Sequence, residues 1–203
     1  MSEETLSFEL VSEPDEVLMT FVAAGDDRPF ELLMRRHAGR LATFLYRLTG
    51  VEEDVEDLVQ ETFLRAYRAR GRYRLEASFV SWVYEIARNA AWNWRRTRRR
   101  KPLHRGLRRG RPGHGSTTLL GTLPGHVTSP SGALAAQELA ARIDEALQGL
   151  SPKYREAVVL CDFERLDYEG AARIAGCSVK TLGSRLARGR EQLRRRIGDA
   201  VSG

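Results

Sequence analysis

Apolar side chains recur at intervals of three, four and seven residues along most of the chain, and alternating apolar and polar runs are nearly absent. The first pattern is typical of amphipathic α-helices and the second of β-strands. We therefore expect an all-α fold. The predicted helices cover about 12–25, 29–48, 55–69, 78–97, 133–148, a segment starting at 152, 168–175 and 179–197.

Residues with special backbone roles mark the helix ends. Ser12 and Asp15 have the spacing of a capping box, in which two side chains satisfy each other's backbone donors. The other predicted N-caps are Ser78, Ser151, Asp167 and Ser178. The glycines expected to end helices are Gly25, Gly50, Gly149 and Gly176.

One stretch breaks the helical period. Residues 100–132 hold seven Gly and four Pro, a third of the segment, without sustained apolar spacing. Such a segment buries too little surface to offset its ordering entropy, which predicts a flexible linker. It divides the chain into two small helical domains, at 12–99 and 133–199.

The 203 residues are 42% hydrophobic and 30% charged, enough for a core in a soluble protein. No apolar run approaches the roughly 18 residues that span a bilayer, and the acidic start is unlike a secretory signal. These features predict a cytoplasmic protein that does not bind membranes. Cys161 and Cys177 form no CxxC pair and have no histidine at ligand spacing, so we expect no disulfide, metal or cofactor.

Charge is distributed unevenly. Residues 1–27 carry eight acids and no Lys or Arg, whereas 95–111 carry ten basic residues and no acid, within a net charge of +6. The basic body predicts a polyanionic partner, nucleic acid before membrane. Because a flexible chain lets the two segments meet, we also expect the free protein to bind DNA poorly.

The last two short helices, separated by residues 176–178, have the spacing of a helix-turn-helix. The predicted buried stripe of the final helix is Val179, Leu182, Leu186, Leu193 and Ile197. The opposite face carries Lys180, Thr181, Ser184, Arg185 and Arg188. These residues begin at the N-terminal end that a recognition helix presents to the major groove. A solvated basic helix is the alternative interpretation.

The helix at 55–69 combines an apolar stripe with an acidic face. The residues able to face the core are Val55, Val59, Thr62, Phe63 and Ala66. Asp54, Asp57 and Glu61 share another face, with Gln60 and Leu64 beside it. Acids in a first turn favour the helix dipole, but Glu61 and an exposed leucine lie beyond that turn. This face suits docking onto a basic protein surface.

All three tryptophans, Trp82, Trp92 and Trp94, lie in the helix at 78–97. Val83, Ile86 and Ala90 form its predicted core stripe, and a second face carries Arg88, Trp92, Arg95 and Arg99. Aromatic rings interleaved with arginine suit single-stranded nucleic acid, where exposed bases stack on flat side chains. Burial of the tryptophans in the core is the alternative.

Four segments resemble a known family. DVEDLVQETFLRAY at 54–67 and SFVSWVYEIARN at 78–89 are similar to sigma domain two of extracytoplasmic-function bacterial sigma factors. LSPKYREAVVL at 150–160 and GCSVKTLGSRLAR at 176–188 are similar to sigma domain four. Together these similarities cover about three quarters of the chain, in the family's order.

The resemblance implies a sigma factor without a catalytic site that directs RNA polymerase core to promoters. Implied contacts with the polymerase beta-prime clamp helices are Asp54, Asp57, Leu58, Gln60, Glu61 and Leu64. Implied minus-ten contacts are Arg72, Tyr73, Phe79, Trp82, Arg88, Asn89, Trp92, Asn93 and Arg95. Implied minus-thirty-five contacts are Ser178, Lys180, Thr181, Ser184, Arg185 and Arg188. The polymerase beta flap and an anti-sigma protein are further implied partners, and holoenzyme would be nucleoid-associated.

Three positions depart from the family's pattern. Gly170 replaces an expected acid, Gly183 a larger residue and Gly189 an alanine. Each interior glycine costs roughly 0.5–1 kcal/mol relative to alanine, so the second domain is expected to be loosely stable. A stand-alone helix-turn-helix regulator and a nucleic-acid hydrolase remain alternatives. The regulator leaves the acidic helix unexplained, and the hydrolase lacks a carboxylate–histidine cluster.

Overall fold

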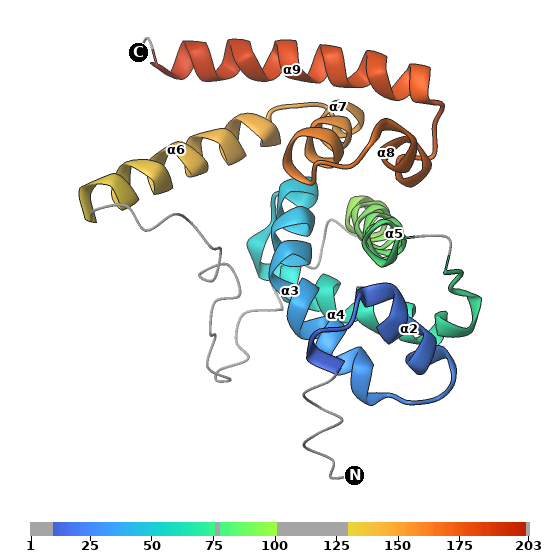
Figure 1. The fold of residues 1–203 in the computed structure, drawn as a ribbon. Helices are drawn as coiled ribbons and strands as arrows, with labels where there is room; N and C mark the ends of the chain where they lie inside the picture. Colours follow the sequence, from blue (N-terminus) through green and yellow to red (C-terminus); the bar gives the residue numbers. More distant parts are fainter. Residues whose placement is uncertain (1–9, 76–77, 101–129, 202–203) are drawn as a thin grey trace.

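Figure 1 shows the computed structural model, which describes residues 10–75, 78–100 and 130–201. All regular elements in these ranges are helical, so the predicted all-α fold is confirmed. The N-terminal set comprises α2 (Asp15–Ala23), α3 (Arg28–Thr49), the 3-10 turn η1 (Glu52–Asp54), α4 (Val55–Arg68), the 3-10 turn η2 (Arg70–Arg72) and α5 (Phe79–Arg100). Most of the predicted linker falls on 101–129, outside the described residues.

The N-terminal set is organised around α3, which contacts α2, α4 and α5. Leu41, Phe44 and Leu45 of α3 are fully or almost fully buried, as are Phe63 of α4 and Tyr84 of α5. The predicted apolar stripe of α4 is entirely buried. Because that stripe is buried, the face of α4 that carries Asp57 and Glu61 points outward.

Sequence signals located most helix ends to within three residues. Gly50 ends α3 in the left-handed conformation, at φ 73°, as a helix-ending glycine does. The capping box predicted for Ser12 and Asp15 is wrong: α2 begins at Asp15, and no side chain among the described residues caps it. The Asp15 carboxylate instead contacts Arg36 and His37 of α3. These contacts with another helix take the place of the predicted local cap.

The C-terminal set contains α6 (Pro130–Gln148), α7 (Pro152–Val158), the π-helical turn η5 (Val159–Phe163), α8 (Tyr168–Ile174) and α9 (Val179–Val201). The helix-turn-helix is formed by α8 and α9, and Gly176 between them has φ 61°. Two predicted caps are confirmed: Asp167 accepts from the Gly170 amide at 2.7 Å and Ser178 from the Thr181 amide at 3.2 Å. Ser151 stands at the N-cap of α7 without a side-chain cap bond to a described residue.

The stripe predicted for α9 is only partly buried. Leu182 and Leu186 are in the core, and Leu193 packs against its edge. Val179, the first residue of the helix, is 43% exposed, so its predicted burial is wrong. Periodicity predicts which face of a helix is apolar, but not which part of that face the neighbouring helices cover.

The two sets of helices lie against each other (Figure 1). α5 packs on α8, while α3 packs on α6, α7 and η5. Buried residues of both sets form one continuous cluster. The chain is therefore closed on itself, and several polar side chains lie in the contact between the sets.

Candidate functional site

A groove of about 640 Å³ runs between α4 and α5; we call it the acidic groove. Its lining consists of Asp54, Asp57, Leu58, Gln60, Glu61, Leu64, Arg65, Ala90, Asn93, Trp94 and Thr97. All six residues for which the resemblance implies polymerase contacts therefore lie together. Leu64 is 42% exposed, whereas Leu58 is buried and forms part of the floor.

Arginines lie beside the carboxylates of the acidic groove. Glu61 accepts from Arg65 at 2.7 Å on the same helix, and Asp54 pairs with Arg98 of α5. These pairs are partly exposed, so each contributes little to stability. Exposed ion pairs are easily exchanged for the cations of a partner, and the leucine beside them supplies apolar contact.

An aromatic cluster lies where η2 leads into α5. The ring centroids of Tyr73 and Trp82 are 5.2 Å apart, and those of Tyr73 and Phe79 are 6.5 Å apart. Phe79 is fully buried, so its implied contact with DNA does not fit this conformation. Arg72 is exposed. Burial, helped by the charges of Glu16 and Asp15, raises the pKa of Tyr73 to about 12, so this hydroxyl is a donor at neutral pH.

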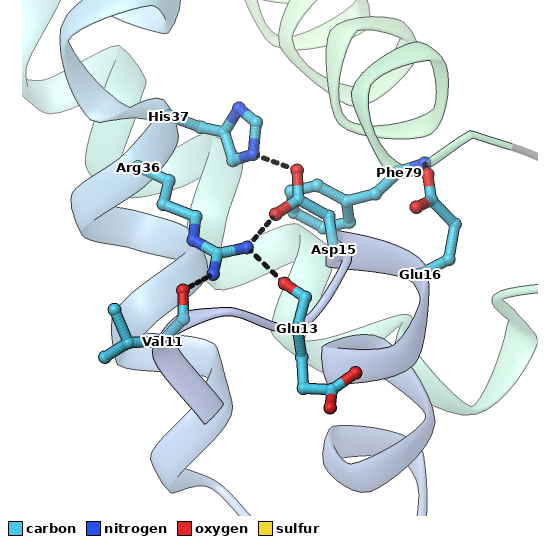
Figure 2. A network of polar contacts seen from close by, with 7 residues as sticks. All are labelled: Val11, Glu13, Asp15, Glu16, Arg36, His37 and Phe79. Atoms are coloured by element: carbon cyan, nitrogen blue, oxygen red, sulfur yellow. Dashed lines mark hydrogen bonds and ion pairs between the residues drawn. The ribbon is translucent and has the colours of Figure 1, made fainter. Parts of the chain in front are cut away.

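The base of this cluster is held by the N-terminal segment (Figure 2). Arg36 of α3 donates to Asp15 Oδ1 at 2.6 Å and to the carbonyl oxygens of Glu13 and Val11 at 2.8 and 2.6 Å. His37 Nε2 lies 2.5 Å from Asp15 Oδ2, and its ring is tilted against that of Phe79, with the centroids 5.2 Å apart.

Glu16, next to Asp15, accepts from the Phe79 amide at 3.1 Å (Figure 2). This bond caps the start of α5 from another helix, since the first amides of a helix lack internal partners. Glu16 thus fixes the start of α5, while Asp15 beside it holds α3.

Three of the implied minus-ten residues on α5 hydrogen-bond other parts of the chain, although Trp92 is also 39% exposed. Arg88 donates from Nε to Glu156 Oε1 at 2.7 Å, and Trp92 donates to the same oxygen at 3.1 Å. Arg95 donates to the Leu48 carbonyl at 3.0 Å. Asn89 is exposed.

Asn93 lies apart from Arg88, Trp92 and Arg95. It lines the acidic groove, on the other side of α5 from the contact with α8. The residues that the resemblance groups as a single DNA surface are therefore divided between the groove, the aromatic cluster and the contact between the helical sets.

The implied minus-thirty-five residues share the start of α9, on the outside of the molecule (Figure 1). Lys180, Thr181, Ser184 and Arg188 are exposed, and Arg185 is half-buried. The Arg188 guanidinium hydrogen-bonds the Tyr154 hydroxyl and lowers its pKa. Ser178 also contacts the Thr181 hydroxyl at 2.8 Å, so its oxygen serves the helix N-terminus.

Four residues of the contact between the sets were missed by sequence reasoning. Arg155, Glu156 and Glu164 are buried charged residues, and Tyr84 of α5 is buried beside Glu164. The available signal is that Arg155 and Glu156 directly precede the apolar run 157–160, where charged residues normally mark a solvated face.

No group of three or more His, Cys, Asp or Glu within the described ranges is arranged to hold a metal. Burial raises the pKa of the Cys161 thiol, which disfavours a reactive thiolate. Within those same ranges, none of the helices is long and apolar enough to cross a membrane.

Comparison with known families gives two matches. Residues 33–101 match Sigma-70 region 2, and residues 140–193 match Sigma-70 region 4. The first match contains the acidic groove and the aromatic cluster, and the second contains the helix-turn-helix.

Individual relatives match nearly the whole chain. It is 32% identical to the RNA polymerase sigma-H factor of Pseudomonas aeruginosa, over 91% of this chain and 94% of that one. It is 31% identical to the ECF RNA polymerase sigma-E factor of Haemophilus influenzae, over 90% and 95%.

Two solved structures share the fold. CnrH, solved with the cytosolic domain of CnrY, is 26% identical and superposes with a TM-score of 0.65 over 93% of this chain and 99% of that one. The sigma factor RpoE of Bartonella quintana, solved with the anti-sigma factor NepR, is 24% identical with a TM-score of 0.63, over 83% and 96%.

Proposed function

Since this chain belongs to the extracytoplasmic-function family of RNA polymerase sigma factors, which direct promoter-specific initiation of transcription, we propose how its parts divide that work. Residues 12–99 form sigma domain two, 133–199 form sigma domain four, and 100–132 connect them. The protein is a DNA-binding subunit, and nucleotide addition belongs to the polymerase.

The acidic groove is the docking site for the clamp helices of the polymerase beta-prime subunit. This assignment rests on one observation: the six residues for which the resemblance implies polymerase contacts all line this groove. Exposed Leu64 beside Asp57 and Glu61 offers apolar contact framed by charge, which favours a specific basic partner. The beta flap is proposed as the partner of sigma domain four.

The aromatic cluster and the neighbouring face of α5 bind the minus-ten element. Tyr73 and Trp82 are partly exposed rings that bases can stack on, and Arg72 beside them is available to phosphate. Arg88 and Trp92 join this surface when sigma domain four moves away from α5, whereas Arg95 bonds the Leu48 carbonyl within sigma domain two. Phe79 supports it from the core.

The start of α9 reads the minus-thirty-five element. Lys180, Thr181 and Ser184 are exposed on its first two turns, the part of a recognition helix that reaches base edges. Arg185 and Arg188 follow on the same face and provide donors for guanine or phosphate.

We further assign the protein to the cytoplasm, with the nucleoid as its place in holoenzyme, and expect an anti-sigma protein as regulator. Reconstitution tests the function: the chain plus core polymerase should start transcripts at defined sites of a genomic promoter library, and core alone should not. Absence of any promoter-dependent transcript, with core binding intact, would refute the assignment.

A further inference from the structure

The contact between the two helical sets centres on the Glu156 carboxylate. Glu156 lies on α7 and is 2% exposed. A single oxygen accepts from Arg88 Nε at 2.7 Å and from Trp92 Nε1 at 3.1 Å, both on α5. Arg88 Nη2 donates in addition to the Ala175 carbonyl at the end of α8, at 3.1 Å. One arginine thus joins α5 to two helices of sigma domain four.

A buried carboxylate is stable only when its charge is paired and hydrogen-bonded. On α5 the pairing is supplied by a guanidinium and an indole N–H that converge on one point. The same donors suit a phosphate oxygen, because arginine forms similar charge-assisted bonds with carboxylate and phosphate. Glu156 therefore occupies an anion site on the surface that the proposed function gives to the minus-ten element.

Further polar contacts hold the sets together around Glu156. Tyr84 donates to Glu164 at 2.6 Å, and Arg47 donates to Asp144 at 3.2 Å. Arg155 donates to the Leu48 carbonyl at 3.0 Å and is 5% exposed. Burial lowers the pKa of Arg155 to about 10, so it still carries its charge at neutral pH. Closure is thus defined by several specific contacts.

The closed arrangement also prevents simultaneous recognition of both promoter elements. α8 packs on α5 and on α9, so a single short helix separates the two proposed DNA surfaces. Elements centred roughly 25 base pairs apart lie about 85 Å apart along the duplex, at about 34 Å per turn. Sigma domain four must leave α5 before the chain can bind a promoter.

Building on the proposed function, we propose that Glu156 is an autoinhibitory latch. Its carboxylate takes the place of a DNA phosphate at Arg88 and Trp92, keeping sigma domain four closed on sigma domain two until polymerase core separates them. The acids of the N-terminal segment that lie within the described residues, such as Asp15 and Glu16, have other partners. Glu156 accounts for the weak DNA binding expected of the free chain, while Glu3, Glu4 and Glu9 of the acidic segment lie outside the described residues.

The test measures binding of the full-length free chain to a fluorescein-labelled, mixed-sequence single-stranded DNA 20-mer, by anisotropy at fixed salt. Such a probe reports phosphate contacts, which do not depend on sequence. Glu156→Gln keeps the shape and removes the charge. It should tighten binding by about tenfold, because affinity scales with the fraction of competent molecules, and should increase the radius of gyration in X-ray scattering.

Glu169→Gln removes the same charge from an exposed position on α8 and is the matched control. An equal gain in both variants, or no gain and no expansion in Glu156→Gln, would overturn the latch. Adding Arg88→Ala to Glu156→Gln should abolish the gain; a gain that persists would show that the released anion site does not bind DNA.

Two further measurements separate the possible failures. Tyr84→Phe removes the bond to Glu164, which joins the same two domains at a distance from Glu156. It should also increase the radius of gyration, so the latch stays testable if Glu156→Gln folds poorly. Run-off transcription of the wild-type chain with core tests the proposed function alone. If wild-type transcription is normal but Glu156→Gln changes neither DNA binding nor the radius of gyration, the latch is rejected and the proposed function stands.

Discussion

The Tyr84 hydroxyl donates a 2.6 Å hydrogen bond to Glu164 Oε2, which joins α5 to the segment after η5. Both side chains are buried. Burial and the negative charge of Glu164 raise the pKa of Tyr84 above its usual range. The proton of this tyrosine is therefore part of the contact between the two domains.

The raised pKa of Tyr84 predicts a loss of stability at alkaline pH. Above its unfolded pKa of about 10, the unfolded chain releases the proton while the folded chain keeps it, so the free energy of unfolding falls as pH rises. Tyr84→Phe should lower that free energy by about 1.5–3 kcal/mol at pH 8 and flatten its decline above pH 10. Urea unfolding at pH 8, 10 and 11 measures both effects.

Tyr154→Phe is the control for this linkage. The pKa of Tyr154 is lowered by Arg188, so its linkage has the opposite sign and its removal should steepen the alkaline decline. Identical slopes for wild type and Tyr84→Phe would show that the Tyr84 proton is not linked to folding.

Charge reversal tests the acidic groove. Asp57→Arg with Glu61→Arg should weaken core polymerase binding by at least about tenfold while helicity stays normal, because like charges facing a basic partner are repelled. Glu53→Arg with Glu56→Arg makes the same charge change outside the acidic groove and should have a smaller effect. Binding is measured by titration with labelled core. Equal losses in the two double variants would point to net charge instead of a docking site.

Two glycines of α9 should respond in opposite directions to alanine. A Cβ at Gly183 would meet no atom within 4 Å, so Gly183→Ala should raise stability by about 0.5–1 kcal/mol. A Cβ at Gly189 would lie 2.7 Å from Val158 Cγ2 and 3.0 Å from the Tyr154 carbonyl oxygen. Gly189→Ala should therefore cost about 1–3 kcal/mol. Urea unfolding of the two variants decides; a stabilising Gly189→Ala would contradict the close packing of α7 on α9.

The recognition helix is tested at Arg185. If its guanidinium reads a guanine edge, Arg185→Ala should cost about 1–3 kcal/mol of binding and relax preference at one base pair. Affinities of holoenzyme for single-base variants of the upstream element provide the measurement. Arg194→Ala, on the exposed far half of α9, should leave base preference unchanged. A uniform loss across all sequences would assign Arg185 to phosphate contact.

The cap on α5 is tested at Glu16. Glu16→Ala removes the acceptor of the Phe79 amide and should cost about 0.5–2 kcal/mol, as loss of a helix cap does. Hydrogen exchange should accelerate at the first amides of α5. Glu13→Ala is the matched control, since Glu13 contacts Arg36 only through its backbone carbonyl. Unchanged exchange at Phe79 would show that the contact does not fix the helix start.

Local signals predicted the helices and the outward acidic face of α4, for identifiable reasons. The stripe of α4 is unambiguous, so Asp57, Glu61 and Leu64 had to lie on its outer face. Periodicity does not reveal which helix covers which face, so it did not show that Asn93 of α5 lines the acidic groove. The same limit hid the contact between the domains.

Glu156 shows why the contact between the domains could not be read from sequence. Within its own helix a glutamate beside Arg155 looks solvated, and its partners lie 64 and 68 positions earlier in the chain. Asp15 failed as a local cap for the same reason, because its partners Arg36 and His37 are distant in sequence. The structural roles of Glu156 and Asp15 thus depend on partners that are distant in sequence.

The π-helical turn η5 sets the rotational phase of everything that follows it. The Glu164 amide bonds the Val159 carbonyl, five residues back, so this turn contains one residue more than an α-helical turn. At 3.6 residues per turn, removing that residue would rotate the next side chain by about 100°. Glu164 would then point away from Tyr84. The register of one short turn thus determines whether the two DNA-reading domains can close on each other, making chain length in 159–163 as consequential as the identity of any residue there.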